Sequence, residues 1–163
     1  MRIRPAVVTD AEAVLEIYNA EVLGSIATFD LVPRSIEEQR AWITDRSGAH
    51  AVLICEDEDG VICGFGALSP YRDRSGYSTT VEDSVYVHAE HRGKGLGRLI
   101  LDAVVETARA HGFHAVMAKI AGGHQVSIDL HLAAGFDIVG REREVGRKFG
   151  KWLDVVLMEQ LLP

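Results

Sequence analysis

The sequence predicts one α/β (α+β) domain that covers residues 1–163 and contains a mixed sheet with helices on its faces. The chain has 163 residues, of which 47% are hydrophobic, and this is enough for one substantial core. Segments with the two-residue period of strands and segments with a helical period follow one another in the order β-α-α-β-β-β-α-β-α-β-β. No linker, repeat or low-complexity segment interrupts this order, so a second domain is not expected.

The chain is expected to begin with a strand and a helix. The segment "RIRPAVV" predicts a short strand over 2–8. The segment 9–23 predicts a helix that starts with a capping box of Thr9 and Glu12. Its buried face is expected to carry Val14, Ile17, Tyr18 and Val22.

A second helix and three strands are expected in the middle of the chain. Ser35 and Glu38 have the spacing of a second capping box and predict the start of that helix. The apolar segments 50–56 and 61–69 are joined by "DEDG", which predicts a hairpin. The segment 78–88, "STTVEDSVYVH", is rich in Thr, Val and Tyr and predicts a further strand.

The C-terminal part alternates helices and strands. The segment 96–112 predicts an amphipathic helix that stops at Gly112. The inward side chains of this helix are expected to be Leu96, Leu99, Ile100, Ala103 and Val104. A strand over 113–121, a short helix over 127–135 that ends at a glycine, and a final strand over 152–161 follow.

Composition excludes several classes of function. A net charge of −7 argues against a nucleic-acid partner, which would need a basic face. No apolar run is long enough for a membrane span, and the N-terminus lacks the apolar region of a signal peptide, so a cytoplasmic protein is expected. Cys55 and Cys63 are expected to be reduced core thiols. The histidine pairs at 88/91 and 111/114 lack a carboxylate or thiol that completes a ligand set, so no metal is expected.

The segment "HRGKGLGRLI", 91–100, is the first candidate binding site. It lies between a predicted strand and a predicted helix, where unpaired N–H groups and the helix dipole favour an anion. Its glycines, which allow the backbone to approach a ligand closely, are Gly93, Gly95 and Gly97. Its cations are Arg92, Lys94 and Arg98. A flexible turn into the helix is the alternative interpretation.

Two common phosphate-binding motifs do not fit this loop. A P-loop needs Gly-x-x-x-x-Gly-Lys-Ser/Thr, which is absent from the sequence, and the dinucleotide motif needs a glycine where Arg98 stands. The spacing Arg-x-x-Gly-x-Gly, formed by Arg92, Gly95 and Gly97, instead resembles the pyrophosphate loop of the GNAT superfamily of N-acetyltransferases.

The resemblance covers nearly the whole chain and is narrower than the superfamily. The segments "IYNAEVLGSIATFD", "SPYRDRSGY", "TVEDSVYVHAEHRGKGLG", "SIDLHLAAGF" and "GRKFGKWLDVVLM" together resemble the branch typified by phosphinothricin and methionine sulfoximine acetyltransferases. This likeness implies the GNAT fold, with a mixed, mostly antiparallel twisted sheet and splayed central strands. It also implies a homodimer that transfers the acetyl group of acetyl-CoA to the α-amine of a small amino-acid analogue, such as phosphinothricin, methionine sulfoximine or methionine sulfone.

The resemblance assigns the acetyl-CoA site to two segments. Main-chain groups of a strand that separates from its neighbour are expected to pair with the pantetheine arm, as an added strand would. These groups belong to Val85, Tyr86 and Val87. The pyrophosphate is expected on Arg92, Gly93, Lys94, Gly95, Leu96, Gly97 and Arg98. His124 stands where the branch commonly has an asparagine that contacts the cofactor, and Ser127 is expected either to bind the cofactor or to cap a helix.

Glu82 is the candidate general base. An amine is mostly protonated at neutral pH, so a nearby proton acceptor must generate the reactive form. The branch has a glutamate at this place; a solvated strand carboxylate is the alternative. Because side chains alternate along a strand, only one of Glu82 and Asp83 is expected to face the site.

His131 is the candidate general acid. It occupies the position at which many superfamily members place a tyrosine in the pattern Leu-Tyr-x-x-x-Gly-Phe. A packed histidine whose ring binds a backbone carbonyl is an equal alternative.

Substrate binding is expected from two segments. Arg72 and Arg74 would lie on one face of an extended segment and are suited to bind a carboxylate or phosphinyl group, although an exposed basic loop is the alternative. Thr28 and Phe29 are expected to form an apolar wall, with Tyr77 as a further candidate. Two other functions remain open: acetylation of a protein N-terminus, a lysine or another small amine, and an acyl-CoA sensor without catalysis.

Overall fold

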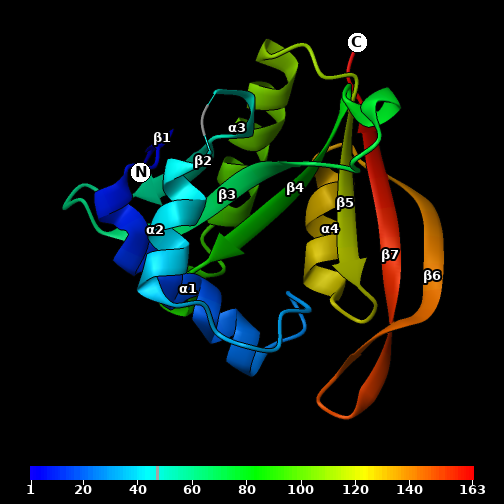
Figure 1. Cartoon of the computed structure of the whole chain (residues 1–163), viewed down its shortest axis with the longest axis horizontal. Helices are drawn as coiled ribbons and strands as arrows, with labels where there is room; N and C mark the ends of the chain where they lie inside the picture. Colours follow the sequence, from blue (N-terminus) through cyan, green and yellow to red (C-terminus); the bar gives the residue numbers. More distant parts are fainter. Residues whose placement is uncertain (47) are drawn as a thin grey trace.

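A seven-stranded sheet with helices on both faces forms the computed structural model, which describes residues 1–46 and 48–163 (Figure 1). The strand order is β1-β2-β3-β4-β5-β7-β6, and β4 and β5 are the one parallel pair among the strands that the structure describes. The predicted order of strands and helices is therefore confirmed, as is a mostly antiparallel mixed sheet.

Where the sequence predicts bounds, they agree with the structure to within a few residues at most element ends; no range was predicted for β6. The strands are β1 (Arg2–Pro5), β2 (Val52–Glu56), β3 (Ile62–Pro70), β4 (Thr80–Val87), β5 (Ala115–Ala121), β6 (Asp137–Lys148) and β7 (Lys151–Leu161). The helices are α1 (Ala11–Gly24), α2 (Ile36–Thr44), α3 (Leu96–Ala110) and α4 (Gln125–Ala133).

Each face of the sheet has its own core. On one face α1 and α2 pack side chains such as Ile17 against Ile54 and Phe65. On the other face α3 and α4 pack side chains such as Ile100 against Leu53. Because neighbouring side chains of a strand point to opposite faces, β2 serves both cores and is buried along its whole length. Cys55 and Cys63 are free, buried thiols of the second core, as the sequence predicts.

The first predicted capping box is wrong, and the second is confirmed. A 3₁₀ turn precedes α1, and the Asp10 carboxylate accepts the Val7 N–H at 2.7 Å and binds the Arg4 guanidinium at 2.8 and 3.0 Å. The hydrogen bond from Arg4 lowers the pKa of Asp10. Ser35 and Glu38 do form the reciprocal pair at the start of α2. Local spacing cannot reveal that Arg4, on a neighbouring strand, anchors the aspartate.

The predicted buried face of α3 is partly wrong. Leu99 is 40% exposed, whereas Leu101 and Val105 are buried beside Ile100 and Val104. Apolar residues occupy more than half of this helix, so more than one stripe satisfies the helical period. The packing of α3 across β2, β3 and β4 selects the stripe that includes Leu101 and Val105.

The two central strands separate, as the resemblance implies. β4 and β5 pair at Thr80 with Ala115, at Val81 with Val116 and at Glu82 with Met117, and their ladder ends there. The rest of β4 continues to pair with β3 on its other side, as far as Val87. The divergence opens the middle of the sheet between β4 and β5 and positions the candidate site.

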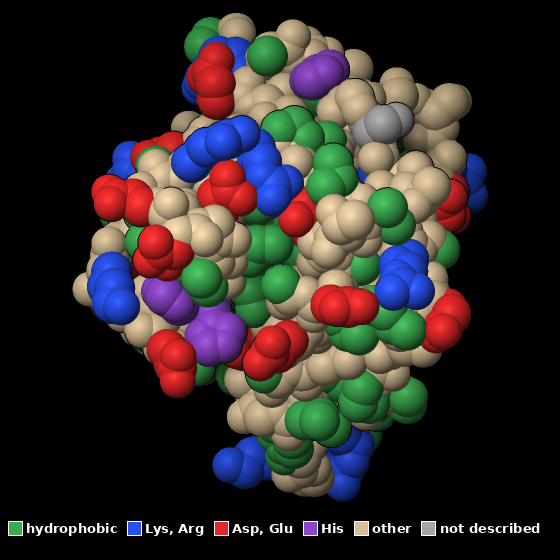
Figure 2. All heavy atoms as spheres, turned by 90° about the vertical axis from the view of Figure 1, so that its left-hand side faces the viewer, with side chains coloured by type: hydrophobic (Ala, Val, Ile, Leu, Met, Phe, Trp, Pro, Cys, Tyr) green, Lys and Arg blue, Asp and Glu red, His purple; other side chains and the backbone are tan. Residues whose placement is uncertain are grey.

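Charged side chains of both signs are interspersed over the face that carries the N-terminus (Figure 2). None of the helices described is both long and apolar enough to cross a membrane.

Candidate active site

Two hollows meet where β4 leaves β5. The first, called here the glycine-loop groove, has a volume of about 410 Å³ and lies between α1, the end of β4, the start of α3 and α4. The second, called the Glu82 pocket, has a volume of about 290 Å³ and lies between β4, β5, α4 and the loop after α1. The residues that line both are Ala27, Val85, Tyr86, His124 and Ser127. A ligand that fills the groove therefore reaches the wall of the pocket.

The glycine loop turns the chain into α3. Gly95 has φ +80° and occupies the N-cap of α3, a left-handed conformation that favours glycine. The first-turn N–H groups that follow it have no partner within a helix and carry the positive end of the dipole. Gly97 lies in this turn, where an added Cβ would be 3.3 Å from the Leu130 side chain. The loop thus presents main-chain donors in the wall of the groove.

Eleven of the twelve predicted cofactor residues line the glycine-loop groove: Val85, Tyr86, Val87, Arg92, Gly93, Gly95, Leu96, Gly97, Arg98, His124 and Ser127. Lys94 does not line it; its Nζ donates to the Glu90 carbonyl at 3.2 Å. Burial lowers the pKa of His124, which favours its neutral form beside the groove.

The two arginines of the groove already have protein partners. Arg92 donates to the carboxylate of the buried Glu21 and to the Val87 carbonyl. Arg98 donates to Asp102 and, at 2.7 Å, to the Ala133 carbonyl. Their charges are therefore partly neutralised by these partners.

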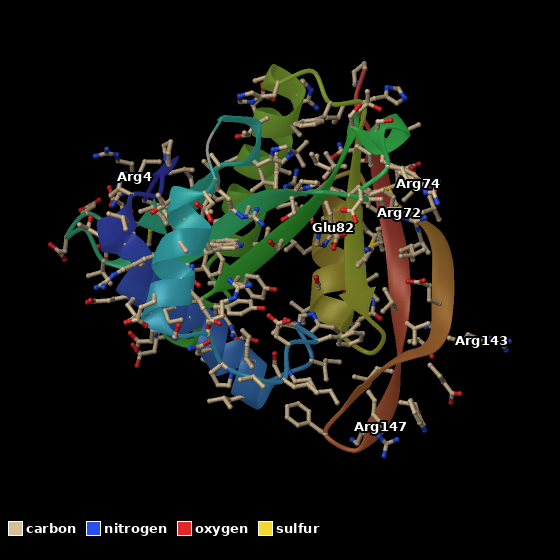
Figure 3. All side chains as sticks on the ribbon, in the orientation of Figure 1. Arg4, Arg72, Arg74, Glu82, Arg143 and Arg147 are labelled. Atoms are coloured by element: carbon tan, nitrogen blue, oxygen red, sulfur yellow. The ribbon has the colours of Figure 1, made fainter. Side chains whose placement is uncertain are left out.

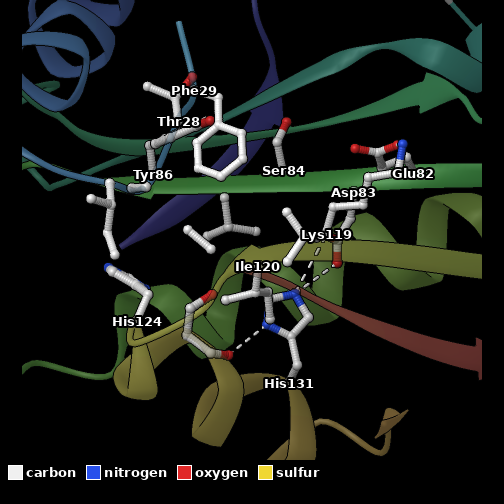
Figure 4. Close-up of a pocket in the computed structure, with 16 residues that line it drawn as sticks. Thr28, Phe29, Glu82, Asp83, Ser84, Tyr86, Lys119, Ile120, His124 and His131 are labelled. Atoms are coloured by element: carbon white, nitrogen blue, oxygen red, sulfur yellow. Dashed lines mark hydrogen bonds and ion pairs between the residues drawn. The ribbon is translucent and has the colours of Figure 1, made fainter. Parts of the chain in front are cut away.

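Both carboxylates of the "VEDSV" segment line the Glu82 pocket, although only one was expected there. Glu82 lies on the open side of β4, where its Oε2 is 3.0 Å from Lys119 Nζ (Figure 4). Asp83 points to the other side, toward His131 on α4. Because β4 and β5 separate beyond Glu82, side chains on both sides of β4 reach the same hollow.

His131 is buried with both ring nitrogens engaged. Its Nδ1 donates to the Ser127 carbonyl at 2.7 Å, and its Nε2 is 3.1 Å from Asp83 Oδ2. A carbonyl and a carboxylate only accept hydrogen bonds, so this geometry favours the imidazolium with a proton on each nitrogen. Burial alone would lower the pKa of His131, but the hydrogen bond and charge of Asp83 and the Ser127 carbonyl raise it above its ordinary value. The ring is packed edge-on against Phe136 and also lines the pocket, so features of both sequence interpretations are present.

We predict that Asp83→Asn destabilises the protein by about 1–3 kcal/mol at pH 6 and by less at pH 9. His131 has a raised pKa in the folded state, so its stabilisation is complete below its unfolded pKa and is lost as pH rises through the folded pKa. Urea unfolding of both proteins at several pH values measures the difference. A difference that is independent of pH would contradict the charged pair.

The loop after α1 forms the roof of the Glu82 pocket with Thr28 and Phe29. The Thr28 hydroxyl is 3.1 Å from the Tyr18 hydroxyl, and the Thr28 carbonyl accepts from Lys148 Nζ at 2.7 Å. The Phe29 ring lies against Gly146 of β6 and leaves no room for a Cβ there. The β6–β7 hairpin therefore fixes the roof, and burial lowers the pKa of the Lys148 ammonium that joins them.

The remaining predicted substrate residues lie outside the lining of the pocket. Arg72 and Arg74 are exposed in the loop between β3 and β4, beyond Glu82 as seen from α1 and α2 (Figure 3). The Arg72 guanidinium covers the rings of Tyr71 and Tyr77, at 4.9 and 5.3 Å from their centroids. The segment turns into a 3₁₀ helix at 75–77 and is not extended, so the spacing of the arginines does not place them on one face.

Sequence reasoning missed two charged residues of the pocket. Lys119 stands in "AVMAKIA", an otherwise apolar strand, and a single lysine there has no motif to mark it. Asp83 was set aside by the alternation rule. The one available signal is a charged side chain inside a strand that the sequence predicts to be buried. No cluster of three or more His, Cys, Asp or Glu side chains among residues 1–46 and 48–163 is arranged to hold a metal ion.

Comparisons with known proteins identify the class. The family model described as "Acetyltransferase (GNAT) domain" matches residues 3–157. The chain is 39% identical over 158 residues to the L-methionine sulfoximine/L-methionine sulfone acetyltransferase of Pseudomonas aeruginosa, which covers 96% of this chain and 92% of the relative.

Solved structures agree with this match. A phosphinothricin acetyltransferase of the GNAT superfamily from Sinorhizobium meliloti, in complex with acetyl-CoA, has a TM-score of 0.92 and 36% identity, covering 99% of this chain and 88% of that one. A ribosomal-protein-alanine N-acetyltransferase from Brucella melitensis has a TM-score of 0.96 and 36% identity, covering 99% and 100%. The fold is that of an acyl-transferring enzyme, and the chain belongs to the GNAT family of acetyltransferases. The acetyl donor of this family is acetyl-CoA.

Proposed function

We propose that this enzyme acetylates the α-amine of a small free amino acid of the methionine sulfoximine, methionine sulfone or phosphinothricin type. The observation that carries the proposal is the shared wall of the two hollows: a donor in the glycine-loop groove and an amine in the Glu82 pocket meet beside Val85. The pocket, at about 290 Å³ and roofed by Thr28 and Phe29, is of a size suited to a small metabolite. The names of the similar proteins support the same class of substrate.

The residues of the groove fit coenzyme A. The β4 main chain from Val85 to Val87 has no strand neighbour on the β5 side among the described residues, so it is suited to pair with an amide-containing arm. The first turn of α3, after the left-handed Gly95, is suited to hold the pyrophosphate. Acetyl-CoA, when bound, supplies an acetyl group activated as a thioester.

Two side chains are proposed to move protons. Glu82 is 27% exposed at the pocket and accepts a proton from the substrate ammonium, which frees the nitrogen lone pair for attack. His131 holds a proton at Nε2, toward Asp83 and the pocket, and is the proposed acid for the leaving sulfur. Thr28 and Phe29 provide the wall for the substrate side chain, while Arg72, Arg74 and Tyr77 are proposed as substrate contacts at the rim beyond Glu82.

A substrate panel tests the proposal. Methionine sulfoximine, methionine sulfone, phosphinothricin, unmodified amino acids and a peptide with an N-terminal alanine are incubated with acetyl-CoA, and release of the CoA thiol is measured. We expect turnover of one or more of the three analogues and a much lower kcat/KM for the peptide. Preference for the peptide would favour protein acetylation instead. Acetyl-CoA binding without turnover of any amine would favour a sensor.

We further propose that residues 1–163 act as one domain of a cytoplasmic homodimer. Val145, Phe149 and Trp152 of the β6–β7 hairpin are each more than half exposed, which supports an apolar contact between copies. The two free thiols are typical of a reducing compartment. Sedimentation of the wild type and of Trp152→Glu tests the dimer, which a monomeric wild type would contradict. Cell fractionation tests the location.

A further inference from the structure

Lys119 lies beside the proposed general base. It projects from β5 toward the Glu82 side of β4, and its Nζ is 3.0 Å from Glu82 Oε2 (Figure 4). The ammonium also lies 5.3 Å from the centroid of the Tyr71 ring. The Lys119 side chain is 38% exposed, so its charge is accessible from the pocket.

Lys119 supplies the positive charge on this side of the pocket. Among the described residues that line the Glu82 pocket, it is the only lysine or arginine. Of the two histidines there, His131 is committed to Asp83 and Ser127, and burial lowers the pKa of His124. Any anionic group of a ligand that lies close to Glu82 therefore has Lys119 as its nearest cationic partner in the lining.

The Glu82–Lys119 pair matches the charges of a free amino acid. An α-amino acid at neutral pH carries an ammonium and a carboxylate on a single carbon atom, so its two charges are close together, as are those of Glu82 and Lys119. A partly exposed ion pair contributes little to stability. A zwitterion can therefore separate the two side chains at low cost and satisfy both, with its ammonium on Glu82 and its carboxylate on Lys119.

We propose that Lys119 binds the α-carboxylate of the amino-acid substrate while Glu82 receives its α-amine. The proposal rests on the proposed function. It identifies the Lys119 charge as the feature that restricts the substrates of the enzyme to free amino acids. Arg72 and Arg74, which the sequence assigns to the carboxylate, are the rival candidates. Lys119 is preferred to them because they lie outside the pocket lining. An amide, an ester or a peptide of the same amino acid lacks the charge that Lys119 binds, and is a poor substrate for that reason.

The experiment compares an acid with its amide. Methionine sulfone and its carboxamide are assayed with the wild type, Lys119→Met, Lys119→Arg, Arg72→Met and Arg74→Met. Lys119→Met keeps an unbranched apolar stem and removes the charge. We expect it to lower kcat/KM for the acid by on the order of ten- to a hundredfold, mainly through KM, and to change the amide little. The preference for acid over amide should collapse in Lys119→Met and survive in Lys119→Arg. In Arg72→Met and Arg74→Met, which remove proposed contacts at the rim, any loss of kcat/KM should be equal for acid and amide, so the ratio should survive there as well.

Several results overturn the proposal. An unchanged acid-to-amide ratio in Lys119→Met excludes Lys119 as the carboxylate ligand, and collapse of the ratio in Arg72→Met or Arg74→Met assigns the carboxylate to that arginine. An equal loss for both substrates means that Lys119 only positions Glu82. If the wild type acetylates no amino acid at all, the proposed function is wrong and the assignment falls with it. Acetyl-CoA affinity, measured by calorimetry, verifies that each variant is folded.

Discussion

Glu82→Gln is expected to lower kcat for the amino-acid substrate by about 10²–10⁴ at neutral pH, the usual contribution of general-base catalysis. Glutamine has the same shape and keeps an acceptor oxygen, but it cannot take the proton of the ammonium. Glu82 does not line the glycine-loop groove, so acetyl-CoA should bind as it does to the wild type. Activity should recover in part at high pH, where more of the amine is already deprotonated.

Single-turnover kinetics measure the loss of catalysis, and calorimetry measures the affinity for acetyl-CoA. Glu37→Gln, which removes an exposed carboxylate of α2 outside both hollows, is the matched control and should behave as the wild type. Turnover of Glu82→Gln near the wild-type rate at pH 7 would rule out Glu82 as the base.

Gly95→Val is expected to weaken acetyl-CoA binding by at least about a hundredfold. A valine at φ +80° is strained, because its Cβ crowds the following carbonyl in the left-handed region. The chain must rotate at the N-cap of α3, and this moves the first-turn N–H groups that are proposed to hold the pyrophosphate. The expected loss of affinity is large because several charge-assisted hydrogen bonds are lost at the same time.

Gly60→Val separates the loss of binding from backbone strain. Gly60 also has φ +80°, no described atom lies within 4 Å of the position of its added Cβ, and it sits in the β2–β3 turn outside the groove. Both variants should lose similar unfolding free energy, and only Gly95→Val should lose affinity in calorimetry. Wild-type affinity in a folded Gly95→Val would show that the loop does not bind the cofactor.

The parts of the structure that were predictable from sequence depend on local patterns. The Ser35–Glu38 box, the glycine loop and the order of elements each follow from residues that are close together in the chain. The placement of Glu82 at the pocket followed from a family motif. Side-chain contacts that follow no motif were not predictable, even between residues close in the chain: Arg4 binds Asp10 where a Thr9–Glu12 capping box was expected, and Arg72 lies against the rings of Tyr71 and Tyr77.

The partners of the catalytic candidates belong to the same class of contact. Lys119 meets Glu82 because β4 and β5 are adjacent, and Asp83 reaches His131 because the strands diverge after Glu82. Neither of these two contacts can be recognised from the spacing of residues in the sequence. The sequence thus yields the groups that carry the chemistry, while the fold yields the groups that hold and neutralise them.

The divergence of β4 and β5 also affects the stability of the folded chain. Most sheets have their unpaired edges on the outside, where charge or a covering loop protects them. Here an edge of β4 lies inside the molecule. The two halves of the sheet are joined directly by the three residue pairs of the β4–β5 ladder, which lie at one end of the two strands. A ligand that pairs with this free edge of β4 fills the gap between β4 and β5. Bound acetyl-CoA would then add contacts to the folded state that the free enzyme lacks. A ligand that binds only the folded state adds about 2.7 kcal/mol to the unfolding free energy at a concentration a hundred times its Kd. The resistance of this enzyme to heat and proteolysis should therefore follow the supply of acetyl-CoA around it.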